Sequence, residues 1–380
     1  MKKEKYFGMS PRIARWKLDT PIENWLSYRA DHSERWKYIY LFYYNLFDHK
    51  YYTKGKGMAK KVIQSHVCSD DIKDTYAVVL DMLYCLHRFG FSFENYCTYD
   101  FAHNKDLEYR SSFVADKLRY HYCDILNSKK IFEIMTDKYA CYQHYGKYFK
   151  RTMIGCYSEK DRDGFNSFVN HHTSFIYKPI EEHSGHGVEI FNCDKIDPNV
   201  FFDNKLANGA FVIEELIEQG EELARMHPNS VNSCRVLTFT LGKKVEIIGT
   251  TWRVGAGNAI VDNAGSGGMY ASINPKTGIV ETDAINFRGL QFEKHPDTGV
   301  QFRGFQMPLW NEAILLVKEM ASFISGSTLI SWDIAYSNKG WVMVEANENG
   351  GWNVIQSNKK IGLKQQLFGY MDEFFKNSSL

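Results

Sequence analysis

Two carboxylates and an amide near the C-terminal end of the sequence have the types and spacing of metal ligands. The stretch LISWDIAY-SNKG-WVMVEAN (residues 329–347) predicts two strands joined by a turn. Because strand side chains alternate between two faces, Glu345 and Asn347 share a face, and the turn places Asp333 beside them on the partner strand. Hard oxygen ligands of this kind suit Mg²⁺. We predict one or two Mg²⁺ ions here, for which Mn²⁺ could substitute, with a water-facing acidic hairpin as the alternative.

A lysine and a glycine-containing loop further upstream could hold phosphate. The segment FIYKPIEEHSGHGVEIF (175–191) predicts a strand with Lys178, a loop with Ser184, Gly185 and Gly187, and a second strand. Backbone N–H groups of such a loop can close over phosphates, and the lysine adds a point charge. The order strand, glycine loop, strand fits neither a P-loop nor a dinucleotide fold. We interpret it as a phosphate flap that is mobile without nucleotide, although an ordinary hairpin also explains it.

The segment FVIEELIEQGEEL (211–223) could bind a nucleoside. A run of β-type residues reaches Glu214 and Glu215, passes through Ile217 and meets Glu221. A strand of this kind can pair an adenine edge through its backbone, while a later carboxylate accepts hydrogen bonds from ribose hydroxyls. Acids that follow a strand are also commonly just solvated, so the pattern alone leaves both interpretations open.

Two arginines lie on successive strands of a hairpin predicted over 234–254. Arg235 and Arg253 could each bind phosphate or carboxylate oxygens bidentately and so act on a transferring phosphoryl group, with structural ion pairs as the alternative. Downstream, Asp262, Asn263 and the glycines of AGSGG form either a substrate loop or an ordinary turn. His227 fits a packing role, and the absence of a GxSxG pattern disfavours nucleophilic hydrolysis.

These residues are positioned by a chain that changes character near residue 125. Up to that point the sequence predicts mainly helix, including one over 72–88 that stops at Gly90. Beyond it, helices predicted over 137–147, 309–324 and 361–375 alternate with the strands above, so the fold class is α+β. The aromatic segment 36–52 predicts a helix that packs within its own domain, with contact to a membrane surface as the alternative.

The composition favours a small-molecule site over a polyanionic partner. With 46 Lys and Arg against 45 Asp and Glu, no global basic field exists to hold nucleic acid. The eight scattered cysteines suit free thiols in a reducing compartment. No signal-peptide pattern occurs, and no apolar run approaches the roughly 20 residues that span a bilayer. We expect a cytoplasmic protein without stable membrane insertion, and the oligomeric state stays open.

Taken in order, these features resemble the ATP-grasp superfamily, and most closely its sugar-transfer associated branch, which is related to the glutamate ligases. The resemblance covers residues 128–375, where TDKYACYQHY, SGHGV, EELIEQGEE, WDIAY and VEANENGGW look like the family's successive motifs. It implies two α+β subdomains that clasp ATP after a mainly helical N-terminal domain. The implied divisions are 1–125 for the helical domain, 126–213 for the lid subdomain and 214–380 for the subdomain with the metal site.

The resemblance also implies a role for each site residue. Lys138 and Lys178 would face the phosphates, under the loop of Ser184, Gly185 and Gly187. The adenine would lie at Glu214, Glu215 and Ile217, and the ribose at Glu221. Magnesium would be held by Asp333, Glu345 and Asn347, and the transferring phosphoryl group by Arg235 and Arg253. Glu222 lies one residue from Glu221, so the ribose assignment is open between them.

The implied reaction joins a carboxylate to an amine. The carboxylate takes the γ-phosphoryl group of ATP, and the amine then displaces phosphate to leave an amide. The name of the branch suggests surface polysaccharide or capsule biosynthesis, with an amino acid or amine joined to a uronic acid-type sugar. The alternatives are an ATP-grasp phosphotransferase, acting as a sugar or polyol kinase, and a non-enzymatic nucleotide-binding scaffold protein.

Overall fold

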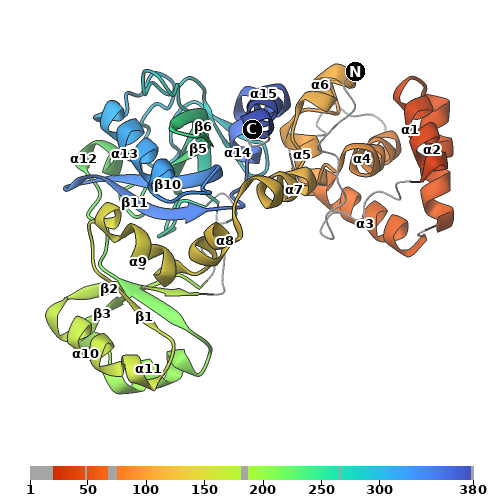
Figure 1. Ribbon diagram of the computed structural model, residues 1–380. Coiled ribbons are helices and arrows are strands. Elements are labelled where there is room, and N and C mark those ends of the chain that lie inside the picture. Colours follow the sequence, from red (N-terminus) through yellow and green to blue (C-terminus); the bar gives the residue numbers. More distant parts are fainter. Residues whose placement is uncertain are drawn as a thin grey trace.

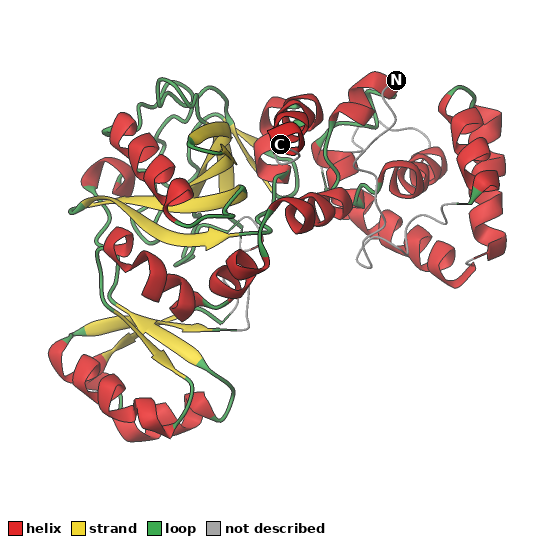
Figure 2. Cartoon of the chain, viewed as in Figure 1, coloured by secondary structure: helices red, strands yellow, loops and turns green. Residues whose placement is uncertain are grey.

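The computed structural model describes residues 20–47, 49–66, 75–180, 187–263, 265 and 267–377. It contains a helical body, a small antiparallel sheet covered by helices, and a larger antiparallel sheet between them (Figure 1). Helices dominate the N-terminal body, while the strands lie in the other two (Figure 2). The mixed fold class and the helical N-terminal region predicted from the sequence are confirmed.

The helical body has one apolar core, formed by buried residues between Leu26 and Ala115. The Thr20 hydroxyl accepts the N–H of Glu23 at 3.1 Å and so caps the first helix. Gly90, at φ 83°, ends the helix predicted over 72–88, whose described part begins at residue 75. The helices of this body are α1 (Pro21–Asp31), α2 (Glu34–Phe47), α3 (His49–Ser65), α4 (Thr75–Phe89), α5 (Phe93–Thr98) and α6 (Leu107–Ser112).

The aromatic segment 36–52 packs within this body on one face only. Tyr40, Leu41 and Tyr44 are buried in the core. The opposite face of α2 exposes Tyr38, Ile39, Phe42 and Leu46, and Phe47 is exposed as the last residue of the helix. The interpretation that this segment packs aromatic bulk within its own domain holds for Tyr40, Tyr44 and the partly buried Trp36, Tyr43 and Tyr52. It does not hold for Tyr38, Phe42 and Phe47, because only one stripe of α2 faces the core.

The smaller sheet has the strand order β1-β4-β2-β3 with antiparallel neighbours. Its strands are β1 (Met153–Cys156), β2 (Ser174–Pro179), β3 (Glu189–Asn192) and β4 (Phe211–Glu214), and its helices are α10 (Arg162–His171) and α11 (Pro198–Leu206), with 3₁₀ turns at Glu159–Asp161 and Cys193–Lys195. Tyr177 and Ile213 lie in the core under the two helices. Since strand side chains alternate, Lys178 and Glu214 lie on the other face of this sheet.

The larger sheet has the order β11-β10-β5-β6-β7-β8-β9. Its strands are β5 (Ser233–Leu241), β6 (Lys244–Val254), β7 (Met269–Ser272), β8 (Ala284–Asn286), β9 (Gln291–Phe292), β10 (Leu329–Ser337) and β11 (Gly340–Asn347). The two predicted hairpins are confirmed as β5–β6 and β10–β11. In the second, a two-residue turn leads to Gly340 at φ 78°, a value that favours glycine.

Helices cover both faces of the larger sheet. On one face Val236 packs with α8 (Lys129–Thr136), α9 (Lys138–Phe149) and α13 (Trp310–Phe323). On the other, Leu237 packs with α7 (Asp116–Leu126), α14 (Asn353–Lys359) and α15 (Lys364–Asn377). The predicted helices over 137–147, 309–324 and 361–375 are thus α9, α13 and α15. Helices α8 and α9 fall within the predicted lid subdomain 126–213 but pack on the larger sheet. The division of the chain at 125 and 213 stays a proposal.

Two further expectations concern covalent and membrane features. No disulfide joins any of the seven described cysteines, and Cys68 lies outside the described residues. Of the helices in the described part of the chain, none combines the length and the apolar character needed to cross a bilayer.

Candidate functional site

The hairpin β10–β11 brings the three predicted metal ligands together. Asp333 lies directly opposite Glu345 in the strand register, and a bulge follows on the next residue. The Asn347 amide nitrogen lies 3.2 Å from Glu345 Oε1 and 3.5 Å from Asp333 Oδ2. Within the described residues no three Cys, His, Asp or Glu side chains gather to hold a metal, so the amide is required as the third ligand. A half-turn of the amide presents its oxygen instead of its nitrogen.

Asp333 is fully buried between two guanidinium groups. Arg235, its register partner on β5, donates from Nε and Nη2 to the two carboxylate oxygens, at 2.8 Å each. Arg253 Nη2 lies 2.9 Å from Oδ2. Burial acts to raise the pKa of Asp333, but the two arginines overcome it and hold this pKa well below its usual range. These contacts use three of the roughly four acceptor positions of the carboxylate.

Glu345 has the opposite electrostatic environment. Burial and the neighbouring charge of Asp333 raise the pKa of Glu345, and the arginines only partly offset this. The interaction between the two carboxyl groups lowers the pKa of Asp333 and raises that of Glu345. Two adjacent carboxyl groups and an amide fit a cation well, because a divalent ion would offset the repulsion between the carboxylates.

The two arginines form ion pairs in this structure, which was the alternative weighed for them. Arg253 donates to Ser233 Oγ at 2.7 Å and also reaches Asp262, 3.7 Å from its Nε. Asp262 in turn accepts the Ser233 N–H at 2.8 Å. Arg235 differs, because its Nη1 makes no hydrogen bond to any described residue. One edge of this guanidinium is therefore available to an anion, and the catalytic role of both arginines remains a proposal.

A second ion-paired group lies on the smaller sheet, around Glu214. Lys178 pairs with one oxygen of this carboxylate, and Arg151 Nε donates to the other at 2.7 Å. Burial acts to raise the pKa of Glu214, but Arg151 and Lys178 lower it overall. Arg151 Nη1 also donates to the Met343 carbonyl on β11 at 2.6 Å, two residues before Glu345. Arg151 thus joins the smaller sheet to the strand that carries the predicted metal ligands.

Arg151 was missed by the sequence analysis. Between Asp137 and Glu159 the sequence contains basic residues but no acid, and Arg151 directly precedes the apolar run of β1. An arginine entering a buried strand needs a partner, and here the partner had to come from a distant segment. That local excess of positive charge was the available signal.

The predicted phosphate flap is only partly described. Lys138 Nζ donates to the carbonyls of Pro179 and Ile180 at 2.9 Å each, at the end of β2. Asp137 caps α9 by accepting two backbone N–H groups. Gly187, at φ 69°, lies so close to Pro179 that a Cβ would come within 2.9 Å. Ser184 and Gly185 lie outside the described residues, and the mobility expected of their loop stays a prediction.

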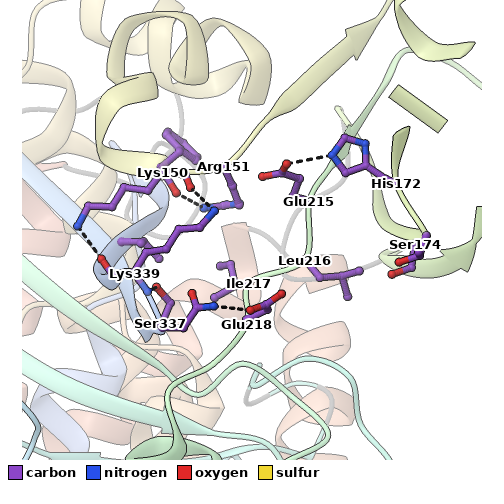
Figure 3. Close-up of a pocket in the computed structure, with 14 residues that line it drawn as sticks. Lys150, Arg151, His172, Ser174, Glu215, Leu216, Ile217, Glu218, Ser337 and Lys339 are labelled. Carbon is purple, nitrogen blue, oxygen red and sulfur yellow. Dashed lines mark hydrogen bonds and ion pairs between the residues drawn. The ribbon is translucent and has the colours of Figure 1, made fainter. Parts of the chain in front are cut away.

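The predicted adenine hinge lines a cavity of about 250 Å³ between the two sheets (Figure 3). The Glu215 carboxylate accepts from His172 Nε2 and from the Thr152 N–H, each at 2.9 Å. The peptide groups of Leu216 and Ile217 have no hydrogen-bond partner within the described part of the chain. They are therefore available to a base edge. The full lining is Phe149, Lys150, Arg151, His172, Thr173, Ser174, Glu215, Leu216, Ile217, Glu218, Ser337, Asn338, Lys339 and Val342.

The remaining hinge residues extend the larger sheet. Gln219 bridges to Ser337, and the Gly220 N–H donates to the Tyr336 carbonyl at 2.9 Å. Glu221 is the exposed first residue of α12 (Glu221–Ala224), immediately after this bridge. His227 is buried, with its ring nitrogens 2.8 Å from Ser230 Oγ and 3.0 Å from the Gly257 carbonyl, in agreement with the predicted packing role.

Two sheets joined by a hinge, with the acidic hairpin on the larger one, are the arrangement that the sequence motifs implied for an ATP-grasp protein. The chain belongs to the sugar-transfer associated ATP-grasp family, whose sequence model matches residues 117–369. No curated protein sequence matches the chain.

Several solved structures show partial similarity to the chain. The ATP-grasp ligase PsnB, complexed with a precursor variant, Mg and ADP, has 10% identity and a TM-score of 0.39, over 68% of this chain and 66% of that chain. D-alanyl-alanine synthetase A from Vibrio cholerae has 10% identity and a TM-score of 0.41, over 64% and 65%. D-alanine–D-alanine ligase from Helicobacter pylori has 12% identity and a TM-score of 0.39, over 68% of each chain. The chain spans about two thirds of the length of each of these proteins.

Proposed function

We propose that this protein is an ATP- and Mg²⁺-dependent ligase that joins a carboxylate to an amine through an acyl phosphate. The observation that carries the proposal is the convergence of Asp333, Glu345 and Asn347 beside Arg235, in a chain of the ATP-grasp family. Bound between these ligands and the nucleotide, Mg²⁺ would neutralise phosphate charge during phosphoryl transfer.

Different groups around the two sheets would bind the nucleoside and the phosphates of ATP. The open peptide groups of Leu216 and Ile217 would pair with adenine, and Glu221 would accept from the ribose. Lys178 and Lys138, on the side of the smaller sheet, would face the phosphates. In this structure Lys178 pairs with Glu214, and Lys138 donates to main-chain carbonyls. The phosphates of ATP would replace or share these acceptors.

The chemistry then takes two steps. A substrate carboxylate oxygen attacks the γ-phosphorus, the bond from that phosphorus to the bridging oxygen breaks, and ADP leaves. The amine nitrogen attacks the acyl carbon, the carbon–oxygen bond to phosphate breaks, and the nitrogen loses a proton. Arg235, with its open Nη1, is suited to hold the oxygens that carry negative charge in both steps. We further propose a uronic acid-type sugar as the carboxylate, in surface polysaccharide biosynthesis.

The test is a screen of uronic acids and their nucleotides against amino acids and amines, with Mg²⁺ and ATP. ADP release that needs both a carboxylate and an amine, with a product of the mass of the amide, is the expected result. Hydroxylamine in place of the amine should give a hydroxamate, because it traps an acyl phosphate. Glu345→Gln should abolish turnover, whereas Glu246→Gln, on the other hairpin of the same sheet, should not. A phosphorylated sugar formed without any amine would identify a kinase and overturn the proposal.

A further inference from the structure

The outer side of the helical body carries a large apolar surface. Helices α1 and α2 lie at the edge of the molecule opposite the smaller sheet (Figure 1). On α1 the side chains of Ile22, Trp25 and Tyr28 are 59%, 50% and 63% exposed. With the five exposed side chains of α2 named above, they make eight of the 22 large apolar side chains found exposed in the described residues. The two helices are only 11 and 14 residues long, so this is a cluster and not a scatter.

The exposed side chains follow the period of the helix. Those of α1 recur every three residues, and Ile39, Phe42 and Leu46 recur at intervals of three and four. Trp25 on α1 meets Trp36 on α2 edge-on, with ring centroids 5.2 Å apart, so the two stripes are held together. We call this surface the aromatic face. A regular stripe that faces solvent indicates selection for contact with something outside the domain.

Positive charge is enriched in the helices that carry and follow the aromatic face. Residues 20–66 contain eight Lys and Arg against four Asp and Glu, whereas the whole chain has a net charge of only +1. Helix α3, which starts at the end of α2, has five lysines and no acid. At the other end of the face, Arg29 lies over the rings of Trp25 and Trp36, 5.5 and 5.7 Å from their centroids. Of the acids described in this range, Glu23 is buried, Asp31 is bound by Arg88, and Glu34 is exposed and pairs with Lys37 at 2.7 Å.

We propose that the aromatic face docks this protein on a membrane surface that contains anionic lipid. Aromatic and aliphatic side chains enter the boundary between headgroups and acyl chains, while neighbouring lysines and arginines contact the anionic headgroups. A second copy of the chain fits less well, because it would bring a second set of α3 lysines toward the first. Nucleic acid would leave Ile39 and Leu46 without favourable contacts. Docking is independent of the ligase proposal, since no residue of the ATP-grasp site takes part.

The experiment measures co-sedimentation of the full chain with vesicles of phosphatidylcholine, with and without phosphatidylglycerol. The parent should bind the mixed vesicles and bind neutral vesicles weakly. The variant Phe42→Ser with Leu46→Ser should bind at least about tenfold more weakly, since both side chains lose apolar contact with lipid. The control Leu315→Ser, at a residue 67% exposed on α13, should bind like the parent.

A second variant tests the charge. Lys50→Gln with Lys54→Gln, at two exposed lysines of α3, should weaken binding by about fivefold per lysine and reduce its dependence on salt. Lys318→Gln on α13 is the matched control. All substitutions are at exposed positions, and circular dichroism checks that each variant is folded.

Three results would overturn the proposal. The first is no vesicle binding by the parent, and the second is equal binding by the parent and the Phe42→Ser, Leu46→Ser variant. The third is that the parent forms a dimer or binds single-stranded DNA, does not bind vesicles, and loses the dimer or the DNA binding in the same variant. That outcome would make the aromatic face an interface of another kind. Loss of ligase activity has no bearing on any of these readouts.

Discussion

Neutralising Asp333 should destabilise the metal-free protein, whereas neutralising Glu345 should leave its stability unchanged or raise it. Asp333→Asn leaves two buried guanidinium groups facing a neutral amide, one side of which is itself a donor. Breaking a buried ion pair by removing one partner costs about 3 kcal/mol or more. At roughly 2 to 4 °C per kcal/mol, the melting temperature should fall by about 6 to 12 °C.

Glu345→Gln should leave the melting temperature unchanged or raise it. The pKa of Glu345 is raised in the folded protein, so its ionised form is disfavoured by folding, and at neutral pH this weakens the fold. Glutamine removes that penalty, and its amide can donate a hydrogen bond to Asp333. The difference from the parent should shrink as the pH falls below about 4, where Glu345 is protonated in both folded and unfolded protein.

The assay is thermal unfolding in a chelator, followed by the same measurement with Mg²⁺ and ADP. A ligand at a hundred times its Kd stabilises by about 2.7 kcal/mol, so the parent should gain several degrees. Neither variant should gain as much if both side chains are metal ligands. Equal melting of Asp333→Asn and Glu345→Gln in the chelator would refute the electrostatic reasoning. A full shift of Glu345→Gln by Mg²⁺ and ADP would remove it from the metal site.

Three further substitutions test other parts of the site. Lys178→Met should weaken ATP binding about tenfold through loss of a charged phosphate contact, as measured by calorimetry, while Lys244→Met in the β5–β6 hairpin should bind like the parent. Arg151→Met should lower the free energy of unfolding by about 3 kcal/mol, because its carboxylate partner is buried; denaturation by urea measures this, and an unchanged midpoint would contradict it. Gly350→Ala should weaken Mg²⁺–ADP binding, since a Cβ there would lie 2.4 Å from a side chain of β10, whereas Gly369→Ala meets no atom and should be neutral or slightly stabilising.

The two hairpins, and the proximity of Asp333, Glu345 and Asn347, could be predicted because they depend on local rules. Alternation along a strand puts Glu345 and Asn347 on one face, and a turn of known length sets which residue of the partner strand lies opposite. The bulge between Asp333 and Ile334 was not predicted, and it lies between the turn and the pair. Counted from the turn alone, Asp333 would lie opposite Val344, so the extra residue on β11 is what brings Asp333 opposite Glu345. The same local reasoning located Gly90 and α9.

The ion pairs could not be predicted, since they join residues far apart in the sequence. Arg235 and Asp333 are 98 positions apart, and they meet only because β5 pairs with β10 in the middle of the larger sheet. Arg151 and Glu214 are 63 positions apart and meet across the end of the smaller sheet. The exposure of half of α2 likewise depends on which stripe packs against the core, which periodicity alone does not decide.

The position of Lys178 relative to the proposed metal ligands follows from these long-range contacts. Lys178 is held by Glu214, Glu214 by Arg151, and Arg151 by the Met343 carbonyl of β11. Two residues further along the same strand lies Glu345. The guanidinium group of Arg151 therefore connects the smaller sheet to the strand that carries Glu345, because it bonds the Glu214 side chain on one side and the main chain of β11 on the other. The variant Arg151→Lys would keep the positive charge, but an ammonium group could not reach both acceptors in this fixed geometry. It should therefore keep the ion pair with Glu214 and lose the hydrogen bond that fixes the position of the smaller sheet relative to β11.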